Sequence, residues 1–392
     1  MTSEDPIVII CAKRTPLGSF RGALASFSAV QLGALAVRGA LEATSLPVDL
    51  MSGLFMGCVL SSGLGQGPAR QVVLGANLPP SIPATHINKV CGSAMQAILS
   101  GFQHLMTENQ DAIVLAGGME SMSNVPYLLP HMREGSHLGH QSILDGLFYD
   151  GLEDAYQHKV MGLFAEETAR KYNFSRDIQD DYVIQSAGRA LEALRLESLK
   201  PELIPVTLKT GEIFATDEPP VRVKLEKIKT LKPAFGENGT ITAATASSLA
   251  DGAAVIAMTR LSTAEKMGMQ PLAVIRGISV HAQEPQWFTT APIQAVSKLS
   301  SRIGWFLGEV DLFEVNEAFA VVPLAFMHAL NIPAQKVNVF GGACSLGHPL
   351  GVSGARIVVT LLNAMTQKSL KRGIATICIG GGEAMAIALE RI

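Results

Sequence analysis

The stretch HINKVCGSAMQAILSG, residues 86–101, changes its structural pattern around a single thiol. A β-prone run ends at Cys91, Gly-Ser follows directly, and the next residues have the apolar spacing of a buried helix. The stretch therefore predicts a strand, a turn and a helix, with Cys91 at the turn. The alternation recurs in PIVIICA (6–12), AVQLGALAVRGALEAT (29–44) and AIVLAGG (112–118). Alternating strands and helices indicate an α/β fold whose sheet is covered on both faces.

The last third of the chain repeats the pattern of the first third. AIVLAGGMESM (112–122) and ATICIGGGEAMA (375–386) both show an apolar strand, a glycine turn, and then Glu and Met. PIVIICA near residue 6 and PLAVIRG near residue 271 are separated by a similar interval. These matches predict an internal duplication, although any two α/β segments share some of this pattern.

The middle of the chain differs from both ends. Residues 120–250 combine a loop-rich stretch, a helical pair and a charged segment with prolines, which is typical of an insertion over a core. We therefore predict an N-terminal half of the core at residues 1–119. An insertion, with the return to that half, follows at 120–250, and a C-terminal half at 251–392.

Composition narrows the class of protein. Hydrophobic residues make up 48% and charged residues 17% of the 392 residues, which fits a globular enzyme with extensive buried surface. The net charge of −3 argues against nucleic acid or an anionic membrane as a main partner. No apolar run approaches the roughly 20 residues that a membrane span needs. The five cysteines are scattered and the N-terminus has no presequence pattern, so we expect reduced thiols and a cytoplasmic location.

Cys91 is the first candidate for chemistry. A thiol at a helix N-terminus has its thiolate stabilised by unpaired backbone N–H groups and by the helix dipole. A nucleophile can be prepared in this way without a metal. The alternative is a small apolar residue of the core, since free cysteines are commonly buried.

Three further candidates also lie at predicted turns. His348 precedes a proline in a glycine-rich loop (338–356), where its ring could polarise a carbonyl or generate a thiolate. Cys378 ends a strand and Gly380–Gly382 follow, so backbone N–H groups can point into a cavity as an oxyanion hole requires. The alternatives are a structural histidine and a buried strand cysteine. Asn316 leaves a strand as a helix is predicted to begin, which also suits a helix cap. Such turns gather at one edge of an α/β sheet, so we expect these residues to meet.

Metal and dinucleotide sites are not predicted. His131, His137 and His140 share a loop, but we do not expect them to bind a metal. GLGQGPAR (63–70) is similar to a dinucleotide loop, but it fails the G-x-G-x-x-G spacing.

With these residues in place, the sequence resembles the thiolase family from end to end. The family's order is kept by AKRTPLGSFRG (12–22), NKVCGSAMQA (88–97), AGGMESMSNVPY (116–127), NEAFA (316–320), GGACSLGHPLGVSGAR (341–356) and CIGGGEAMA (378–386). The resemblance implies duplicated βαβαβαββ halves that form a five-layered αβαβα core with an inserted loop domain. It also implies an acyltransferase that condenses two acetyl-CoA to acetoacetyl-CoA and CoA, or runs in reverse, through an acyl-cysteine. Coenzyme A thioesters would be substrates, and neither a cofactor nor a metal would be needed.

The resemblance also implies a role for each candidate residue. Cys91 would carry the acyl group, and Cys378 would be the acid/base for the methyl group of the second acetyl-CoA. His348 would activate Cys91 and, with a water held by Asn316, stabilise the enolate oxygen. The backbone N–H groups of Cys91 and Gly380 would form the oxyanion hole for the tetrahedral intermediates.

Substrate binding and assembly follow from the same resemblance. The positions that match the family's pantetheine and acyl tunnel are Met161, Phe235, Ala243, Ser247, Leu249 and Phe319. Arg222 lies in a basic segment (222–229) that suits the coenzyme's phosphates, although a solvated charged face explains that segment equally well. Residues 120–145 resemble the loop through which such enzymes join two dimers into a tetramer.

The tunnel departs from the short-chain pattern of the family. Val160 stands where a histidine is usual and Phe288 where a methionine is usual. A 3-ketoacyl-CoA thiolase of longer chain length is therefore the alternative. A decarboxylative enzyme of the ketoacyl-synthase type would share the fold but would not need Cys378. A non-catalytic relative would be expected to have lost one of the four catalytic side chains.

Overall fold

A mixed sheet organises the molecule. The computed structural model describes residues 5–108, 111–135 and 138–392. Within them ten strands form one sheet in the order β12-β13-β14-β11-β1-β10-β5-β3-β4, with β2 paired to β10. The strands are β1 Ile7–Arg14, β2 Gly18–Ser19, β3 Met51–Gly57, β4 Ala84–Ile87, β5 Ile113–Ser121, β10 Ala250–Arg260, β11 Ala273–Ala282, β12 Leu312–Val315, β13 Arg372–Ile379 and β14 Glu383–Glu390.

The sheet consists of two halves that meet along a short seam. Across it β1 and β11 pair only at Val8–Val274 and Ile9–Ala273. On the C-terminal side, β11-β14-β13-β12 repeats β1-β10-β5-β3, with the same antiparallel and parallel directions. A parallel bridge between Phe313 and Val337 takes the position of β4. The strands that we matched in the sequence are therefore equivalent in the structure, and the predicted duplication is confirmed.

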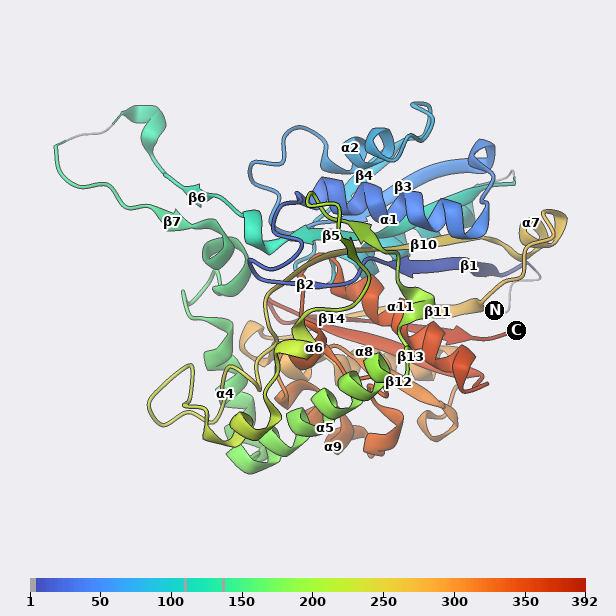
Figure 1. Cartoon of the computed structure of the whole chain (residues 1–392). Coiled ribbons are helices and arrows are strands. Elements are labelled where there is room, and N and C mark those ends of the chain that lie inside the picture. The colour runs from blue at the N-terminus through green and yellow to red at the C-terminus, as the bar shows by residue number, and fades with distance from the viewer. Residues whose placement is uncertain (1–4, 109–110, 136–137) are drawn as a thin grey trace.

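Helices complete five layers. The outer face of the N-terminal half is covered by α1 (Ala29–Thr44) and α2 (Pro68–Gly75). The outer face of the C-terminal half is covered by α8 (Ala291–Ile303), with α9 (Val321–Leu330) beside it. Between the halves, α3 (Ser93–Thr107) packs against α11 (Ser353–Gln367). Figure 1 shows α11 near the middle of the molecule. Helix α11 is buried almost all round, as a helix between two sheets must be. The predicted αβαβα architecture is confirmed.

The repeated glycines differ between the halves. We expected a glycine turn after both matched strands, but Gly117 and Gly118 lie inside β5. A Cβ on Gly117 would lie 2.0 Å from the carbonyl oxygen of Ala254, and one on Gly118 would lie 1.9 Å from that of Gly351. The glycines of β5 therefore permit close backbone packing, whereas Gly380–Gly382 form a true hairpin turn between β13 and β14.

An insertion separates β5 from β10. Its predicted helical pair is confirmed as α4 (Met161–Tyr172) and α5 (Arg176–Arg195), and the Ser175 hydroxyl caps α5. The smaller elements are β6 Tyr127–Leu128, β7 Leu144–Asp145, a π-helical turn Phe148–Leu152, β8 Val206–Thr207, β9 Ile213–Phe214, α6 Pro219–Arg222 and a 3₁₀ helix Leu225–Thr230. The β6–β7 ribbon projects from the body as an arm (Figure 1). Outside the insertion lie two further short helices, α7 Leu261–Lys266 and α10 Ala343–Leu346.

The structure divides the chain at a different residue from the predicted one. We placed the C-terminal half from residue 251, but β10 lies between β1 and β5 in the N-terminal half. None of the helices in the described residues is both long enough and apolar enough to cross a membrane.

A buried ion network ties the insertion to the core. Arg14, at the end of β1, is fully buried and donates through Nε to Glu202 at 2.6 Å. Its Nη atoms donate to both carboxylate oxygens of Asp217 at 2.7 and 2.8 Å. Both carboxylates belong to the insertion.

Replacing Arg14 by alanine leaves these two carboxylates buried without their cation. We expect the free energy of unfolding to fall by about 3–5 kcal/mol, the range for breaking a buried ion pair from one side. Urea denaturation followed by circular dichroism measures the change. Arg195, whose pair with Glu192 is exposed, is the matched control. Equal unfolding midpoints for the two alanine variants would show that the buried network does not stabilise the fold.

Candidate active site

A cavity of about 590 Å³ opens where the two halves meet the insertion. The N-terminal half contributes Cys91 to its wall, and the C-terminal half contributes His348 and Gly380. The insertion contributes most of the remaining wall. Five of the seven predicted substrate residues line the cavity, namely Met161, Phe235, Ser247, Leu249 and Phe319. The other two, Ala243 and Arg222, do not line it, and the exposed Arg222 pairs with Glu218.

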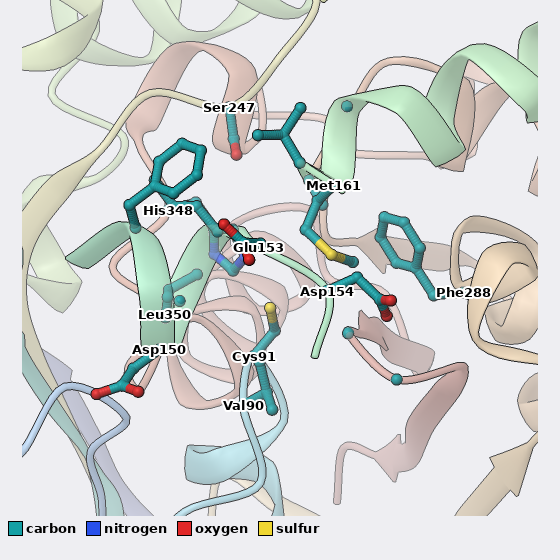
Figure 2. Close-up of a pocket in the computed structure, with 18 of the residues that line it drawn as sticks. Val90, Cys91, Asp150, Glu153, Asp154, Met161, Ser247, Phe288, His348 and Leu350 are labelled. Carbon is teal, nitrogen blue, oxygen red and sulfur yellow. The ribbon is translucent and has the colours of Figure 1, made fainter. Parts of the chain in front are cut away.

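Cys91 lies in a tight turn between β4 and α3. It is 9% exposed, and Figure 2 shows its sulfur directed into the cavity toward His348 and Met161. The preceding residue, Val90, has a φ of +46°, which is rare for a β-branched residue. The Ser93 hydroxyl braces the turn: it accepts from the Lys89 N–H at 2.8 Å and donates to the Val90 carbonyl at 2.6 Å. This bracing holds the sulfur at the start of the helix, as the sequence predicted.

The expected stabilisation of the Cys91 thiolate is outweighed by burial. Burial raises the pKa of Cys91 to about 11, although the backbone N–H groups of Gly380 and of Cys91 itself lower it. The helix end therefore does not by itself lower the pKa of Cys91 below its usual value, as the sequence argument had suggested. The thiol needs a base to become a nucleophile. The same two N–H groups act on the Cys91 sulfur, so the oxygen of an acyl group bound to that sulfur would lie near them.

Cys378 reaches the same place from the C-terminal half. It lies near the end of β13 and is fully buried, and the hairpin turn of Gly380–Gly382 follows. Gly381 and Gly382 have φ values of +90° and +91°, which only glycine adopts readily. Burial and the charge of a Cys91 thiolate raise the pKa of Cys378 well above its usual value. The two sulfurs are therefore electrostatic neighbours, with Cys91 on the cavity wall and Cys378 fully buried near it.

His348 is fixed in one orientation within its loop. Its backbone N–H donates to the Ser248 carbonyl at 2.9 Å, and its Nδ1 lies 2.6 Å from the Ser353 hydroxyl. That hydroxyl donates to the Pro349 carbonyl at 3.0 Å, so it accepts a proton from Nδ1. The lone pair is then on Nε2. Burial, together with the charge of Arg356, lowers the pKa of His348 to about 3, so the ring is neutral at physiological pH and able to act as a base.

Asn316 is not a helix cap. It follows β12, but α9 begins five residues later at Val321 with Ala320 as its N-cap residue. The Asn316 side chain is fully buried, with Nδ2 3.5 Å from His348 Nε2 and Oδ1 3.3 Å from a guanidinium nitrogen of Arg356. Arg356 therefore determines which end of the amide faces the histidine.

Glu120 is a structural partner of the site that sequence reasoning missed. Its buried carboxylate accepts backbone N–H groups from Val59 at 3.0 Å, Leu60 at 3.1 Å and Gly351 at 2.8 Å. Gly351 belongs to the His348 loop, so Glu120 fastens that loop to the N-terminal half. Burial raises the pKa of Glu120. Its partners are distant in the sequence, and the sequence signal was only a glutamate at the end of an apolar strand.

The cavity beyond the sulfur is apolar. Phe319 packs edge-to-face against both Phe235 and Phe288, with ring centroids 6.0 and 6.3 Å apart. Figure 2 shows Phe288 beside Met161 on one side of the cavity. Val160, at the position where a histidine is usual in short-chain relatives, also lines the wall. A short acyl group would therefore meet aromatic side chains.

Acidic side chains near the mouth of the cavity have local partners. The Asp154 carboxylate accepts the backbone N–H groups of Tyr156 and Gln157, and Glu153 pairs with His158. In the described part of the chain, no group of three or more His, Cys, Asp or Glu side chains is placed to hold a metal. His131 and His140 are among these residues, whereas His137 lies outside them.

Comparisons with known proteins agree with this geometry. The family model described as "Thiolase, N-terminal domain" matches residues 7–262, and "Thiolase, C-terminal domain" matches residues 269–391. An Arabidopsis thaliana protein named acetyl-CoA acetyltransferase 2 is 44% identical over 98% of this chain and 96% of its own length. A Gibberella zeae protein named a cytosolic acetyl-CoA acetyltransferase is 40% identical over the whole of both chains.

A solved structure shows the same fold. The crystal structure of Acat5 thiolase from Ascaris suum in complex with coenzyme A superimposes with a TM-score of 0.93 at 40% identity. The superposition covers 99% of this chain and 100% of that one. The family models and the relatives thus span both halves, the insertion and every residue of the site. The chain belongs to the thiolase family.

Proposed function

We propose that the enzyme is an acetyl-CoA C-acetyltransferase, which condenses two acetyl-CoA to acetoacetyl-CoA and CoA and catalyses the reverse thiolysis. One observation carries the proposal: a thiol and a neutral imidazole line one cavity, a second thiol lies within electrostatic range of the first, and the backbone N–H groups of Cys91 and Gly380 lower the pKa of the first thiol. A Claisen condensation needs an acyl carrier, a base for a weakly acidic C–H bond and stabilisation of oxyanions. The names of the relatives support the same substrate.

The first half-reaction acylates Cys91. His348 Nε2 takes the proton of the Cys91 thiol, and the thiolate attacks the carbonyl carbon of acetyl-CoA. The N–H groups of Cys91 and Gly380 hold the oxyanion that forms. The intermediate collapses to an acetyl thioester on Cys91, and the departing CoA sulfur takes the proton of Cys378, which leaves Cys378 as the thiolate and His348 protonated.

The second half-reaction forms the carbon–carbon bond. Cys378, as its thiolate, removes a proton from the methyl group of a second acetyl-CoA. His348 and a water on Asn316 stabilise the enolate oxygen. The enolate carbon attacks the acetyl carbonyl on Cys91, collapse of that intermediate releases acetoacetyl-CoA, and the departing Cys91 sulfur takes its proton back from His348. No cofactor or metal enters either step.

Removing the Asn316 amide tests the enolate site. We expect Asn316→Ala to lower kcat about 10²-fold, or about 2.7 kcal/mol, which is the lower range for losing one oxyanion-hole element. Steady-state condensation and thiolysis assays measure the change. Asn363→Ala is the control, because the amide of the half-buried Asn363 donates to Ser198 and Glu202 and does not line the cavity. A fall in kcat of less than threefold in Asn316→Ala would show that Asn316 has only a structural role.

The aromatic wall favours short acyl chains. Phe235, Phe288 and Phe319 occupy the space that a long chain would need beyond the thioester. Thiolysis rates measured on 3-ketoacyl-CoA substrates of increasing chain length test this proposal. A maximum at acetoacetyl-CoA with a fall thereafter supports it, whereas a flat or rising profile favours the 3-ketoacyl-CoA thiolase. Failure of the wild-type enzyme with all of them would contradict the function.

We also propose that the protein is a cytoplasmic homotetramer, a dimer of dimers. The β6–β7 arm supports this assembly because it projects from the body and exposes the apolar side chains Tyr127, Leu129, Leu138 and Ile143. A monomer rarely exposes so many apolar groups together without a partner. Light scattering after chromatography measures the mass, and lysines in place of Leu129 and Ile143 should reduce tetramers to dimers. The cytosolic name of one relative supports the compartment.

A further inference from the structure

Two segments meet at the oxyanion hole, one from each half of the core. The turn at residues 89–92 carries the N–H of Cys91, and the hairpin at 379–383 carries the N–H of Gly380. A Cβ on Gly92 would lie 2.3 Å from the Ile379 side chain, so the two segments are in close contact. Both N–H groups act on one sulfur. Their spacing therefore depends on what holds the two segments together.

An ion pair crosses this contact. Lys89 Nζ bonds the carboxylate of Glu383, 294 positions away in the chain. Their side chains are 22% and 34% exposed, so protein covers most of both. Neither residue lines the cavity, whereas their neighbours Val90 and Gly381 do. The pair thus lies behind the wall that carries the two N–H groups.

Each partner is joined to one of the donors by a short stretch of restrained backbone. On one side, the Lys89 N–H is held by the Ser93 hydroxyl at 2.8 Å, and the strained Val90 leads directly to Cys91. On the other side, Glu383 pairs with Ile379 across the hairpin and so closes the turn that contains Gly380. A movement of the Lys89 side chain would therefore displace the N–H of Cys91, and a movement of the Glu383 side chain would displace the N–H of Gly380.

The far side of the hairpin is anchored separately. The Gln283 N–H donates to the Gly382 carbonyl at 2.9 Å, and a Cβ on Gly382 would lie 2.3 Å from the Gln283 carbonyl oxygen. The hairpin is therefore fixed to its own half by backbone contacts. On the side that faces the turn at residues 89–92, the Glu383 carboxylate of the hairpin accepts a hydrogen bond from Lys89 Nζ.

We propose that the Lys89–Glu383 ion pair is a positioning element that sets the distance between the two N–H donors of the oxyanion hole. The inference rests on the proposed acyl-transfer function. Half-exposed ion pairs contribute little to folding stability, but donors must lie roughly 2.7–3.1 Å from the developing oxyanion. Small displacements of catalytic groups are costly in rate. The pair therefore acts on the transition state and hardly on the fold.

Two single variants and a charge-reversed double variant test the pair. We expect Lys89→Met and Glu383→Gln each to lower kcat about tenfold, less than the complete loss of a donor. KM should stay within about twofold, because neither side chain reaches the cavity. The double variant Lys89→Glu/Glu383→Lys restores opposite charges and should recover most of the lost kcat. Lys266→Met, which breaks the remote pair with Asp111, is the control and should match the wild type.

A second readout does not depend on turnover. Because the Gly380 N–H lowers the pKa of the Cys91 thiol, displacing it should move the rise in Cys91 alkylation by iodoacetamide above pH 8, where free thiolate forms, toward higher pH in both single variants. If the wild type lacks thiolase activity, the proposed function fails while this profile still tests the pair. Single variants with wild-type kcat and profile would overturn the proposal. A double variant as slow as the single variants would also overturn it, since the effect would then come from separate side chains.

Discussion

Replacing Cys378 by alanine is expected to stop carbon–carbon bond formation while Cys91 still accepts an acetyl group. Cys378 is fully buried near Cys91 and alanine keeps its Cβ, so the substitution leaves the nucleophile, His348 and the two N–H donors in place. The condensation loses its base for the methyl proton, and removing a general base costs about 10²–10⁴-fold. We expect a loss near the upper end, about 10³-fold or more, because burial excludes solvent as a substitute base.

Mass spectrometry separates the two half-reactions. After incubation with acetyl-CoA, Cys378→Ala should carry one acetyl group, which peptide mapping places on Cys91. Cys344→Ala is the matched control, because Cys344 is another buried thiol whose pKa is raised by burial but which does not line the cavity. That control should condense acetyl-CoA at close to the wild-type rate. A Cys378→Ala protein without an acetyl adduct would contradict the proposed division between the two thiols.

Replacing His348 by alanine should make Cys91 dependent on hydroxide. The pKa of His348 is lowered to about 3, so the ring is neutral and can accept the thiol proton at every pH from 5 to 9. The pKa of Cys91 is about 11, so without the base its thiolate fraction rises tenfold for each pH unit below that value. We expect Cys91 alkylation in the variant to follow this slope, and kcat at neutral pH to fall about 10³-fold.

The wild-type profile provides the contrast. Between pH 5 and 8 Cys91 of the wild type should be alkylated at a nearly constant rate. Throughout this range the pH is above the pKa of His348, so the ring stays neutral and can accept the thiol proton. His328→Ala is the control, since His328 is exposed and its ring packs against the rings of Tyr172 and Phe174, away from Cys91. Alkylation of His348→Ala with the flat profile of the wild type would show that another group takes the proton.

Local pattern predicted most of the core and the place of the catalytic residues. Cys91, Asn316 and Cys378 each follow or end a strand, and His348 lies in the loop between α10 and α11. Turns that follow strands gather at one edge of an α/β sheet, which is why these residues could be expected to meet. The helical pair expected in the insertion is found as α4 and α5. These features depend on interactions within a few residues of each other.

The features that were missed depend on contacts between distant segments. Glu120 accepts the N–H of Gly351, and Arg356 donates to the amide oxygen of Asn316. Neither contact could be predicted from the residues next to it in the sequence. The pKa of Cys91 is raised, against the sequence argument, because burial by the insertion and the C-terminal half outweighs the helix terminus. The boundary at residue 251 missed β10 for the same reason, since strand order is a property of the whole sheet.

The pairing of β1 has a consequence for biosynthesis. Its partners are β10 and β11, which lie at residues 250–282. Strand β1 therefore leaves the ribosome long before either strand with which it pairs. Pairings so distant in sequence fold slowly, and the waiting segment stays open to aggregation. We therefore expect nascent chains shorter than about two thirds of the protein to need chaperones, and translation to finish well before the enzyme is active.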